Sequence, residues 1–177
     1  MEKPNLIKTA LHEKHLELGA KMVDYSGFEM PVSYDGLKVE HASVREKVGM
    51  FDVSHMGEFT LKGEDALTLL QNITTNDVSN LCDGKIQYSC IPNGKGGIVD
   101  DLLIYRIREG NYMLVVNASN MDKDWSFISH KIKDGAYNVT FENKSDDLAL
   151  IALQGPNATD ALSPLMNVNP GDLAYYT

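Results

Sequence analysis

The stretch that decides the fold runs from Gly84 to Asn120, "GKIQYSCIPNGKGGIVDDLLIYRIREGNYMLVVNASN". It is rich in Val, Ile, Leu and Tyr, which favour β-strands. Two breaks, "PNGKGG" and "REGN", divide it into three strands joined by hairpin turns. "GKGG" is a weaker candidate for a phosphate-binding loop, because it lacks the Lys-Ser/Thr that ends a P-loop. The stretch therefore predicts consecutive antiparallel strands.

The flanking segments add helices and further strands. Helical spacing of apolar residues is found over 5–22, 37–49, 64–74, 121–135 and 156–166. Strand or strand-and-turn composition is found over 50–63, 137–145 and 148–155, and the final "DLAYYT" is similar to the start of another strand. Residues 22–36 are broken by glycine and proline and are expected to be loop with short extended pieces. The mixture predicts an α+β fold with antiparallel sheets flanked by helices.

The bulk composition excludes several classes of protein. The chain has 177 residues, 43% hydrophobic and 23% charged, which is ordinary for one large or two small soluble domains. Sixteen basic and 25 acidic residues give a net charge of -9, with no basic cluster of the kind that binds nucleic acid. No apolar run approaches about 18 residues, and the N-terminus has no secretory apolar region. We therefore expect a cytoplasmic protein that contacts neither membrane nor nucleic acid.

The histidines and cysteines offer no metal site. His12 and His15 stand in "HEKH", which is not the HExxH spacing of zinc proteases, and we expect them on a solvent-facing stripe of the first helix. Cys82 and Cys90 form no CxxC pair, so neither a zinc site nor a disulfide framework is indicated.

Two adjacent aspartates, Asp100 and Asp101, interrupt the apolar middle strand. Successive side chains of a strand point to opposite faces, so at least one carboxylate is directed toward apolar surroundings. A buried charge is costly unless donors or a cation meet it, so it often marks a site. A structural carboxylate that binds backbone N–H groups, or an edge-strand charge that prevents aggregation, is an equally good interpretation.

The next turn decides which aspartate meets Asn117. A three-residue loop, Glu109 to Asn111, would place Asn117 opposite Leu103 and on the face of Asp101. A two-residue loop would place it opposite Leu102, on the face of Asp100. We favour the three-residue loop. In either case a carboxylate and a carboxamide meet, which suits a flat heterocycle with several N–H and C=O groups.

Six motifs resemble the T-protein family, the aminomethyltransferases of the glycine cleavage system. They are "GAKMVDYSGFEMPVSY", "VREKVGMFDVSHMGEF", "TNDVSNL", "GGIVDDLL", "LVVNASNMDKD" and "ALIALQGPNA". They follow the family's order and spacing from about residue 11 to residue 177. The family's proteins are longer, so the chain is similar to their N-terminal half.

The resemblance implies the family's fold, in which three domains surround a central folate cavity. The expected first domain comprises residues 1–53 and, as an incomplete continuation, 147–177, and the second comprises 54–146 with the aspartate hairpin. The chain is expected to be truncated before the C-terminal barrel domain.

The resemblance also implies a reaction. Family members take the aminomethyl group from the lipoyl arm of the H-protein, release ammonia and transfer the one-carbon unit to tetrahydrofolate, giving 5,10-methylenetetrahydrofolate. Matching the motifs assigns the essential aspartate to Asp101 and leaves Asp100 structural. The folate-contacting positions are Met56, Tyr88, Val115, Asn117 and Tyr175.

Two alternatives stay open. The chain is a folate-binding relative that serves another purpose, such as iron–sulfur assembly, or it is an incomplete unit without transferase activity. Because further folate ligands of the family lie in the half that has no counterpart here, we expect the 177-residue chain alone to bind tetrahydrofolate weakly or not at all and not to catalyse the transfer. The longer protein is expected to be monomeric.

Overall fold

The computed structural model describes residues 5–177 as an α+β fold with antiparallel sheets, which confirms the predicted fold class. The chain divides into two compact units. Unit 1 contains the described residues up to His55 together with Ala149–Ala174, and unit 2 contains Met56–Leu148 together with Tyr175–Thr177. The domain bounds implied by the family resemblance stay a prediction.

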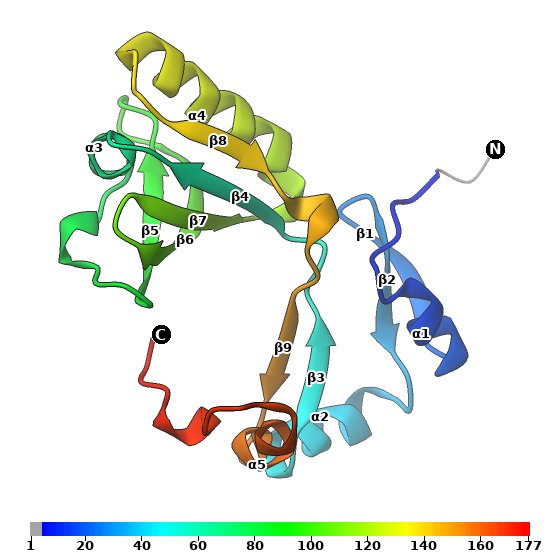
Figure 1. Cartoon of the computed structure of the whole chain (residues 1–177). Coiled ribbons are helices and arrows are strands. Elements are labelled where there is room, and N and C mark those ends of the chain that lie inside the picture. The colour runs from blue at the N-terminus through cyan, green and yellow to red at the C-terminus, as the bar shows by residue number, and fades with distance from the viewer. Residues whose placement is uncertain (1–4) are drawn as a thin grey trace. The chain divides into compact units, whose positions relative to one another are not determined.

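Unit 2 is built on a five-stranded antiparallel sheet in the order β5-β6-β7-β4-β8 (Figure 1). The strands are β4 (Gly57–Lys62), β5 (Ile86–Pro92), β6 (Ile98–Arg108), β7 (Asn111–Val116) and β8 (Thr140–Asn143). The helices are α3 (Ala66–Ile73) and α4 (Met121–Gly135), with 3-10 turns at Val78–Asn80, Ala118–Asn120 and Ser145–Asp147. The three strands predicted within 84–120 are thus confirmed as β5, β6 and β7.

One face of this sheet carries the core of unit 2. Alternate residues of β4, β6 and β7 are buried against apolar residues of α3 and α4, as expected for a sheet with one covered face. The contributors include Phe59, Leu61, Leu102, Ile104, Leu114 and Val116 from the strands and Leu69, Leu70, Ile73 and Ile128 from the helices. We call this the helix face of the sheet, and the opposite one the open face.

The β6–β7 turn differs from the prediction. Arg108 pairs with Asn111, so the loop holds two residues, Glu109 and Gly110, and Gly110 takes a positive φ of 66°, which glycine adopts without strain. Arg106 pairs with Tyr112, so Ile107 is an extra residue that forms a β-bulge. A two-residue loop without a bulge would pair Leu102 with Asn117. The bulge shifts this pairing by one residue, so Leu102 pairs with Val116. The predicted three-residue loop is therefore wrong.

Unit 1 contains two small two-stranded sheets and short helices. Its elements are α1 (His12–Glu17), β1 (Lys21–Tyr25), β2 (Phe28–Ser33), α2 (Leu37–Glu46), β3 (Gly49–Asp52), β9 (Ile151–Gln154) and α5 (Ala158–Leu162), with 3-10 turns at Ser163–Leu165 and Pro170–Asp172. Sheet β1–β2 occupies the segment expected to be mainly loop, and β3 pairs with β9. No strand forms in the "DLAYYT" segment, which is turn and irregular chain.

His12 and His15 are buried, with 3% and 6% of their surface exposed, which contradicts their predicted solvent-facing position. They bind Glu29 and Asp52, which lie 17 and 37 residues further along the chain. Helical spacing within residues 5–22 could not reveal these distant partners.

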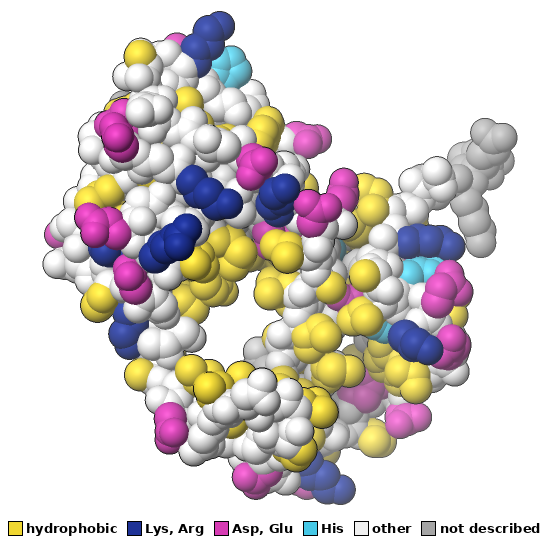
Figure 2. Space-filling model, in the orientation of Figure 1, with side chains coloured by type: hydrophobic (Ala, Val, Ile, Leu, Met, Phe, Trp, Pro, Cys, Tyr) yellow, Lys and Arg dark blue, Asp and Glu magenta, His cyan; other side chains and the backbone are white. Residues whose placement is uncertain are grey.

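The surface shows no concentration of one charge on the face drawn in Figure 2, where Lys and Arg side chains are interspersed with acidic ones. Within residues 5–177, no helix is long and apolar enough to cross a membrane.

Replacement of Phe59 by alanine is expected to destabilise unit 2 strongly. Phe59 is fully buried and makes edge-to-face contacts with Trp125 and Phe141, with ring centroids 5.2 and 5.5 Å apart. Loss of its ring should lower the free energy of unfolding by about 3–5 kcal/mol. Urea unfolding followed by the fluorescence of Trp125, the single tryptophan, measures this change. Ile98→Ala, at a position 56% exposed, is the control and should change stability by about 0.5 kcal/mol or less. Equal losses in both variants would contradict the assignment of the core.

Candidate functional site

The two aspartates of β6 lie on opposite faces of the sheet. Asp100 alternates with the buried Leu102 and Ile104 on the helix face and is itself 8% exposed. Asp101 lies on the open face and is partly exposed. A second β-bulge immediately precedes the pair, because Ile91 pairs with Asp100 while Pro92 pairs with Ile98. Bulges redirect side chains and are frequent beside active sites.

Asn117 connects the two carboxylates. Its Nδ2 donates to Asp101 Oδ1 at 2.7 Å and to Asp100 Oδ1 at 3.1 Å. The register explains this contact: Leu102 pairs with Val116, so Asn117, the next residue, reaches Asp101. The sequence therefore correctly predicted that Asp101 and Asn117 meet, although neither loop length considered gives the observed pairing.

Tyr88 completes the surroundings of Asp101. Its hydroxyl donates to Asp101 Oδ2, so each carboxylate oxygen has one side-chain donor. This hydrogen bond, and secondarily the partial burial of the phenol, raises the pKa of Tyr88 to about 12, so the hydroxyl stays protonated at neutral pH. Two donors, one from β5 and one from the residue that follows β7, thus hold the Asp101 carboxylate in one orientation.

The floor beside this carboxylate is a row of side chains across four strands of the open face. Tyr88 pairs with Leu103, Leu103 with Val115, and Val115 with Glu58. Val115 is 3% exposed, and Tyr88 is 48% exposed. Tyr88 therefore presents its ring next to a fixed carboxylate, where it can pack against a flat ring whose N–H groups meet the carboxylate, whereas Val115 is covered by the protein.

Met56 stands at the same end of the sheet as Asn117. It directly precedes β4, and the first residue of β4, Gly57, pairs with Val116. The structure therefore brings five of the six predicted positions, Met56, Tyr88, Asp101, Val115 and Asn117, to neighbouring strands of unit 2.

Tyr175, the sixth predicted position, lies outside the strands of the sheet. It belongs to the short terminal segment of unit 2, and the carbonyl of the next residue, Tyr176, accepts from Ile86 N at the start of β5 at 3.0 Å. Tyr175 is 89% exposed, and its ring contacts that of Tyr176 in a tilted arrangement, with centroids 4.6 Å apart. The segment thus reaches the strand that carries Tyr88, but the Tyr175 side chain points to solvent.

Glu58 was missed by the sequence analysis. It is 2% exposed, and neither carboxylate oxygen has a hydrogen-bond partner among the described residues. Burial raises its pKa to about 7. An unpartnered buried carboxyl group on the face that carries Asp101 is a candidate site residue. The available signal was a glutamate at a strand position in the motif "GMFDVSHMGEF".

Unit 1 contains a second polar cluster, centred on Asp52. Its Oδ2 accepts from Thr9 at 2.7 Å and is 2.8 Å from His15 Nε2, while His15 Nδ1 is 2.7 Å from the Tyr34 hydroxyl. Burial opposes ionisation of Asp52, but the hydrogen bonds from His15, Ser54 and Thr9 prevail and lower its pKa. These contacts tie α1 and β2 to β3.

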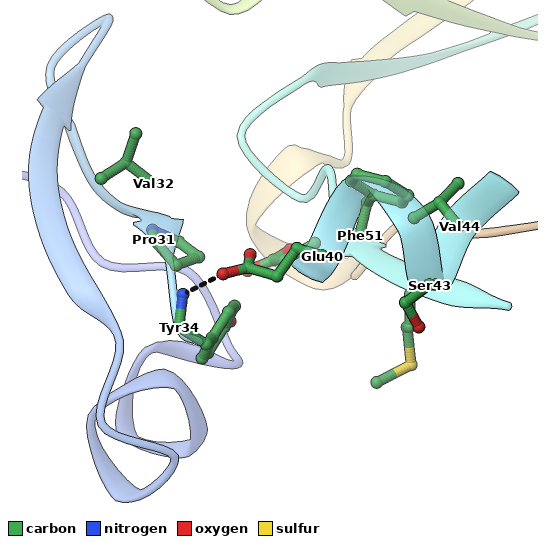
Figure 3. A pocket seen from close by; sticks show the side chains of 10 residues that line it. Pro31, Val32, Tyr34, Glu40, Ser43, Val44 and Phe51 are labelled. Carbon is green, nitrogen blue, oxygen red and sulfur yellow. Dashed lines mark hydrogen bonds between the residues drawn. The ribbon is translucent and has the colours of Figure 1, made fainter. Parts of the chain in front are cut away.

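A pocket of about 250 Å³ borders this cluster (Figure 3). The Glu40 carboxylate in it accepts from the backbone N–H groups of Tyr34 and Gly36, both at 2.7 Å. This pocket is a weaker candidate for the predicted ligand than the open face of unit 2, because none of the six predicted site residues lines it. Within the part of the chain that the structure describes, no group of three or more His, Cys, Asp or Glu is arranged to hold a metal.

The sequence matches a known protein family over most of its length. Residues 11–177 match the family described as GCVT N-terminal domain. The aminomethyltransferase of Flavobacterium psychrophilum is 54% identical over 169 residues, and that of Chloroherpeton thalassium is 55% identical over 168. The match covers 96% and 95% of this chain but 46% of each relative, so the chain spans about half their length.

A solved structure agrees with the fold. The crystal structure of glycine cleavage system aminomethyltransferase T from Bartonella henselae matches 98% of this chain and 47% of its own chain, with a TM-score of 0.87 and 30% identity.

Glu58→Gln is expected to flatten the pH dependence of stability. The folded state holds the Glu58 proton up to about pH 7, whereas the ordinary pKa of 4.5 applies to the unfolded chain. The unfolded chain therefore binds fewer protons between these values, and the free energy of unfolding falls as pH rises through them. Glutamine does not titrate, so the variant should gain stability over the parent at about pH 8 relative to about pH 4.5. Urea unfolding at both pH values measures this gain. Glu109→Gln, on the exposed turn, is the control, and a stability difference that is independent of pH would refute the buried carboxyl group.

Proposed function

The chain belongs to the GCVT N-terminal domain family, and we propose that it provides the folate-binding part of an aminomethyltransferase of the glycine cleavage system. The proposed reaction transfers the one-carbon unit from the aminomethylated lipoyl arm of the H-protein to tetrahydrofolate. Ammonia and the dihydrolipoyl form of the H-protein are released, and 5,10-methylenetetrahydrofolate is formed. The observation that carries the proposal is the Asp101 carboxylate, held on the open face by the Tyr88 hydroxyl and the Asn117 amide.

The geometry supports a defined role for Asp101. Both of its oxygens already accept one hydrogen bond, and each retains further acceptor capacity for an N–H group of the pterin ring. Attack of folate N5 on the aminomethyl carbon uses the nitrogen lone pair and leaves positive charge on N5. A fixed carboxylate nearby stabilises that charge and orients the ring without taking up a proton itself.

The remaining predicted residues are proposed to bind the ring. Met56 and Val115 supply apolar walls, and the Tyr88 ring packs its face while its hydroxyl stays bound to Asp101. Tyr175 is proposed to contribute from the terminal segment of unit 2.

A second candidate function is folate binding without transfer. The observation that favours it is the coverage of the relatives, of which this chain spans 46%. Calorimetric titration of the 177-residue chain with tetrahydrofolate, beside a transfer assay with lipoylated H-protein, separates the two. Binding without transfer supports the second function, and transfer supports the first. Absence of binding both to this chain and to the protein expressed from its complete reading frame would refute both.

Asp101→Asn is expected to lower kcat/KM for aminomethyl transfer by roughly a hundredfold or more, because the neutral amide cannot stabilise charge at N5. Asp100→Asn, the matched control on the other face, should retain activity within about tenfold and lower stability by about 1–3 kcal/mol. The assay uses the protein expressed from its complete reading frame, and denaturant unfolding confirms that each variant folds. Equal losses of activity in two folded variants would show that the roles are not divided between the faces.

A further inference from the structure

Three hydrogen-bonded side chains of unit 1 form a row that ends at the pocket of about 250 Å³. Asp52 Oδ2 is 2.8 Å from His15 Nε2, and His15 Nδ1 is 2.7 Å from the Tyr34 hydroxyl. The side chains of Asp52 and His15 are 0% and 7% exposed, whereas Tyr34 is 39% exposed and lines the pocket. The buried end of the row is thus fixed, and its last member is accessible to a ligand.

The Asp52 carboxylate sets the direction of the hydrogen bonds in this row. A carboxylate can only accept, so His15 Nε2 carries a hydrogen and donates it to Asp52. The neutral imidazole then has no hydrogen on Nδ1, which accepts the hydrogen of the Tyr34 hydroxyl. Because its one hydrogen is used in this way, Tyr34 Oη can only accept a hydrogen bond from a ligand in the pocket.

Glu40 supplies a second acceptor from α2. Its Oε1 accepts from the backbone N–H groups of Tyr34 and Gly36, both at 2.7 Å, which fixes the carboxylate beside the end of β2 (Figure 3). Among the described residues, no group donates to Oε2 and no basic side chain forms an ion pair with Glu40. The pocket is therefore lined by a fixed carboxylate that has one free oxygen and no cation as partner.

The electrostatic surroundings of the pocket are negative. The pKa of Tyr34 is raised, first by burial and then by the negative charges of Asp52 and Glu40. Ser43, a further polar residue of the lining, donates its hydroxyl hydrogen to the carbonyl of Val48 at 3.3 Å, so its oxygen also remains only an acceptor. The polar side chains of the pocket thus favour a ligand that is a cation and a hydrogen-bond donor, and they oppose an anion.

The rest of the lining is apolar and is contributed by Pro31 and Val32 of β2, Val44 of α2, and Met50 and Phe51 of β3. These side chains can pack along an aliphatic chain, as apolar surfaces do along the stem of lysine. The aromatic rings of Tyr34 and Phe51 can in addition attract a cation. The pocket is smaller than the about 300–1,000 Å³ of sites for drug-sized ligands, so it suits a short chain.

We propose that this pocket of unit 1 binds a primary ammonium group carried on a short aliphatic chain. The Glu40 carboxylate and the Tyr34 oxygen accept its N–H groups, and the apolar side chains enclose the chain. A free alkylamine and a lysine side chain both present this group. Because none of the predicted folate residues lines the pocket, the inference stands or falls independently of the proposed function.

The test titrates the protein expressed from its complete reading frame with n-butylamine near neutral pH, where the amine is charged. Nitrogen-15 NMR should show saturable shifts of the backbone N–H signals of Tyr34 and Gly36, which bind Glu40. The uncharged n-butanol, which has the same chain length, should bind at least about tenfold more weakly, as expected for a lost charged hydrogen bond. Equal affinity for the two compounds, or no shift of these signals, would overturn the proposal.

Glu40→Gln keeps an oxygen for the two backbone N–H groups but has no charge, so it should bind n-butylamine about tenfold more weakly and n-butanol as the parent does. Glu46→Gln, at an exposed position of α2 outside the pocket, is the matched control and should bind both compounds as the parent does. Unchanged n-butylamine affinity in a folded Glu40→Gln variant would refute the site. Near-ultraviolet circular dichroism verifies folding. Should Glu40→Gln not fold, the comparison of the two compounds on the parent protein still decides the matter.

A further titration distinguishes the two sources of the ammonium group. N-acetyl-lysine methylamide carries the lysine side chain on a short piece of backbone. Binding of this compound with an affinity within about tenfold of that of n-butylamine would identify the ligand as a lysine side chain of a protein. Binding of n-butylamine alone would identify it as a free alkylamine, and binding of neither would overturn the proposal.

Discussion

The candidate site depends on one amide group placed between two negative charges. Asp100 and Asp101 are adjacent, and like charges so close repel each other unless donors reach them. The Nδ2 of Asn117 supplies donors to both, at 3.1 and 2.7 Å, although the two carboxylates leave the strand on opposite sides. It can do so because Asn117 follows the last residue of β7, where the chain is released from the ladder. The open face and the helix face are thus joined at this residue.

The Asp101 and Asp100 carboxylates, on the two faces of the sheet, have different surroundings. On the open face, Asp101 is partly exposed, and each of its oxygens accepts a hydrogen bond from a neutral donor. On the helix face, Asp100 is 8% exposed, and the Asn117 amide donates a hydrogen bond to it. A single strand therefore carries one partly exposed and one buried carboxylate, and the same amide donates to both.

Much of this arrangement could be predicted from the sequence, and the exceptions have physical causes. Strand alternation placed Asp100 and Asp101 on opposite faces, and the motif match selected Asp101. The pairing of Asn117 could not be predicted, because the bulge at Ile107 has no sequence signal of its own in an ordinary strand composition. Glu58 was missed because burial by distant elements, and not a local pattern, makes it unusual.

The bulge at Ile107 has a consequence for how the hairpin can change in evolution. The exposed tip tolerates substitution, since Ile107, Arg108 and Glu109 point largely to solvent. Loss or gain of a single residue there is different, because it would rotate every side chain of β7 to the other side of the sheet. Asn117 would turn away from Asp101. Val115 would move to the helix face, and its neighbours in β7 would move from the core to the open face. The length of this remote tip is therefore constrained as tightly as the identity of the site residues, whereas its exposed positions other than Gly110 tolerate substitution.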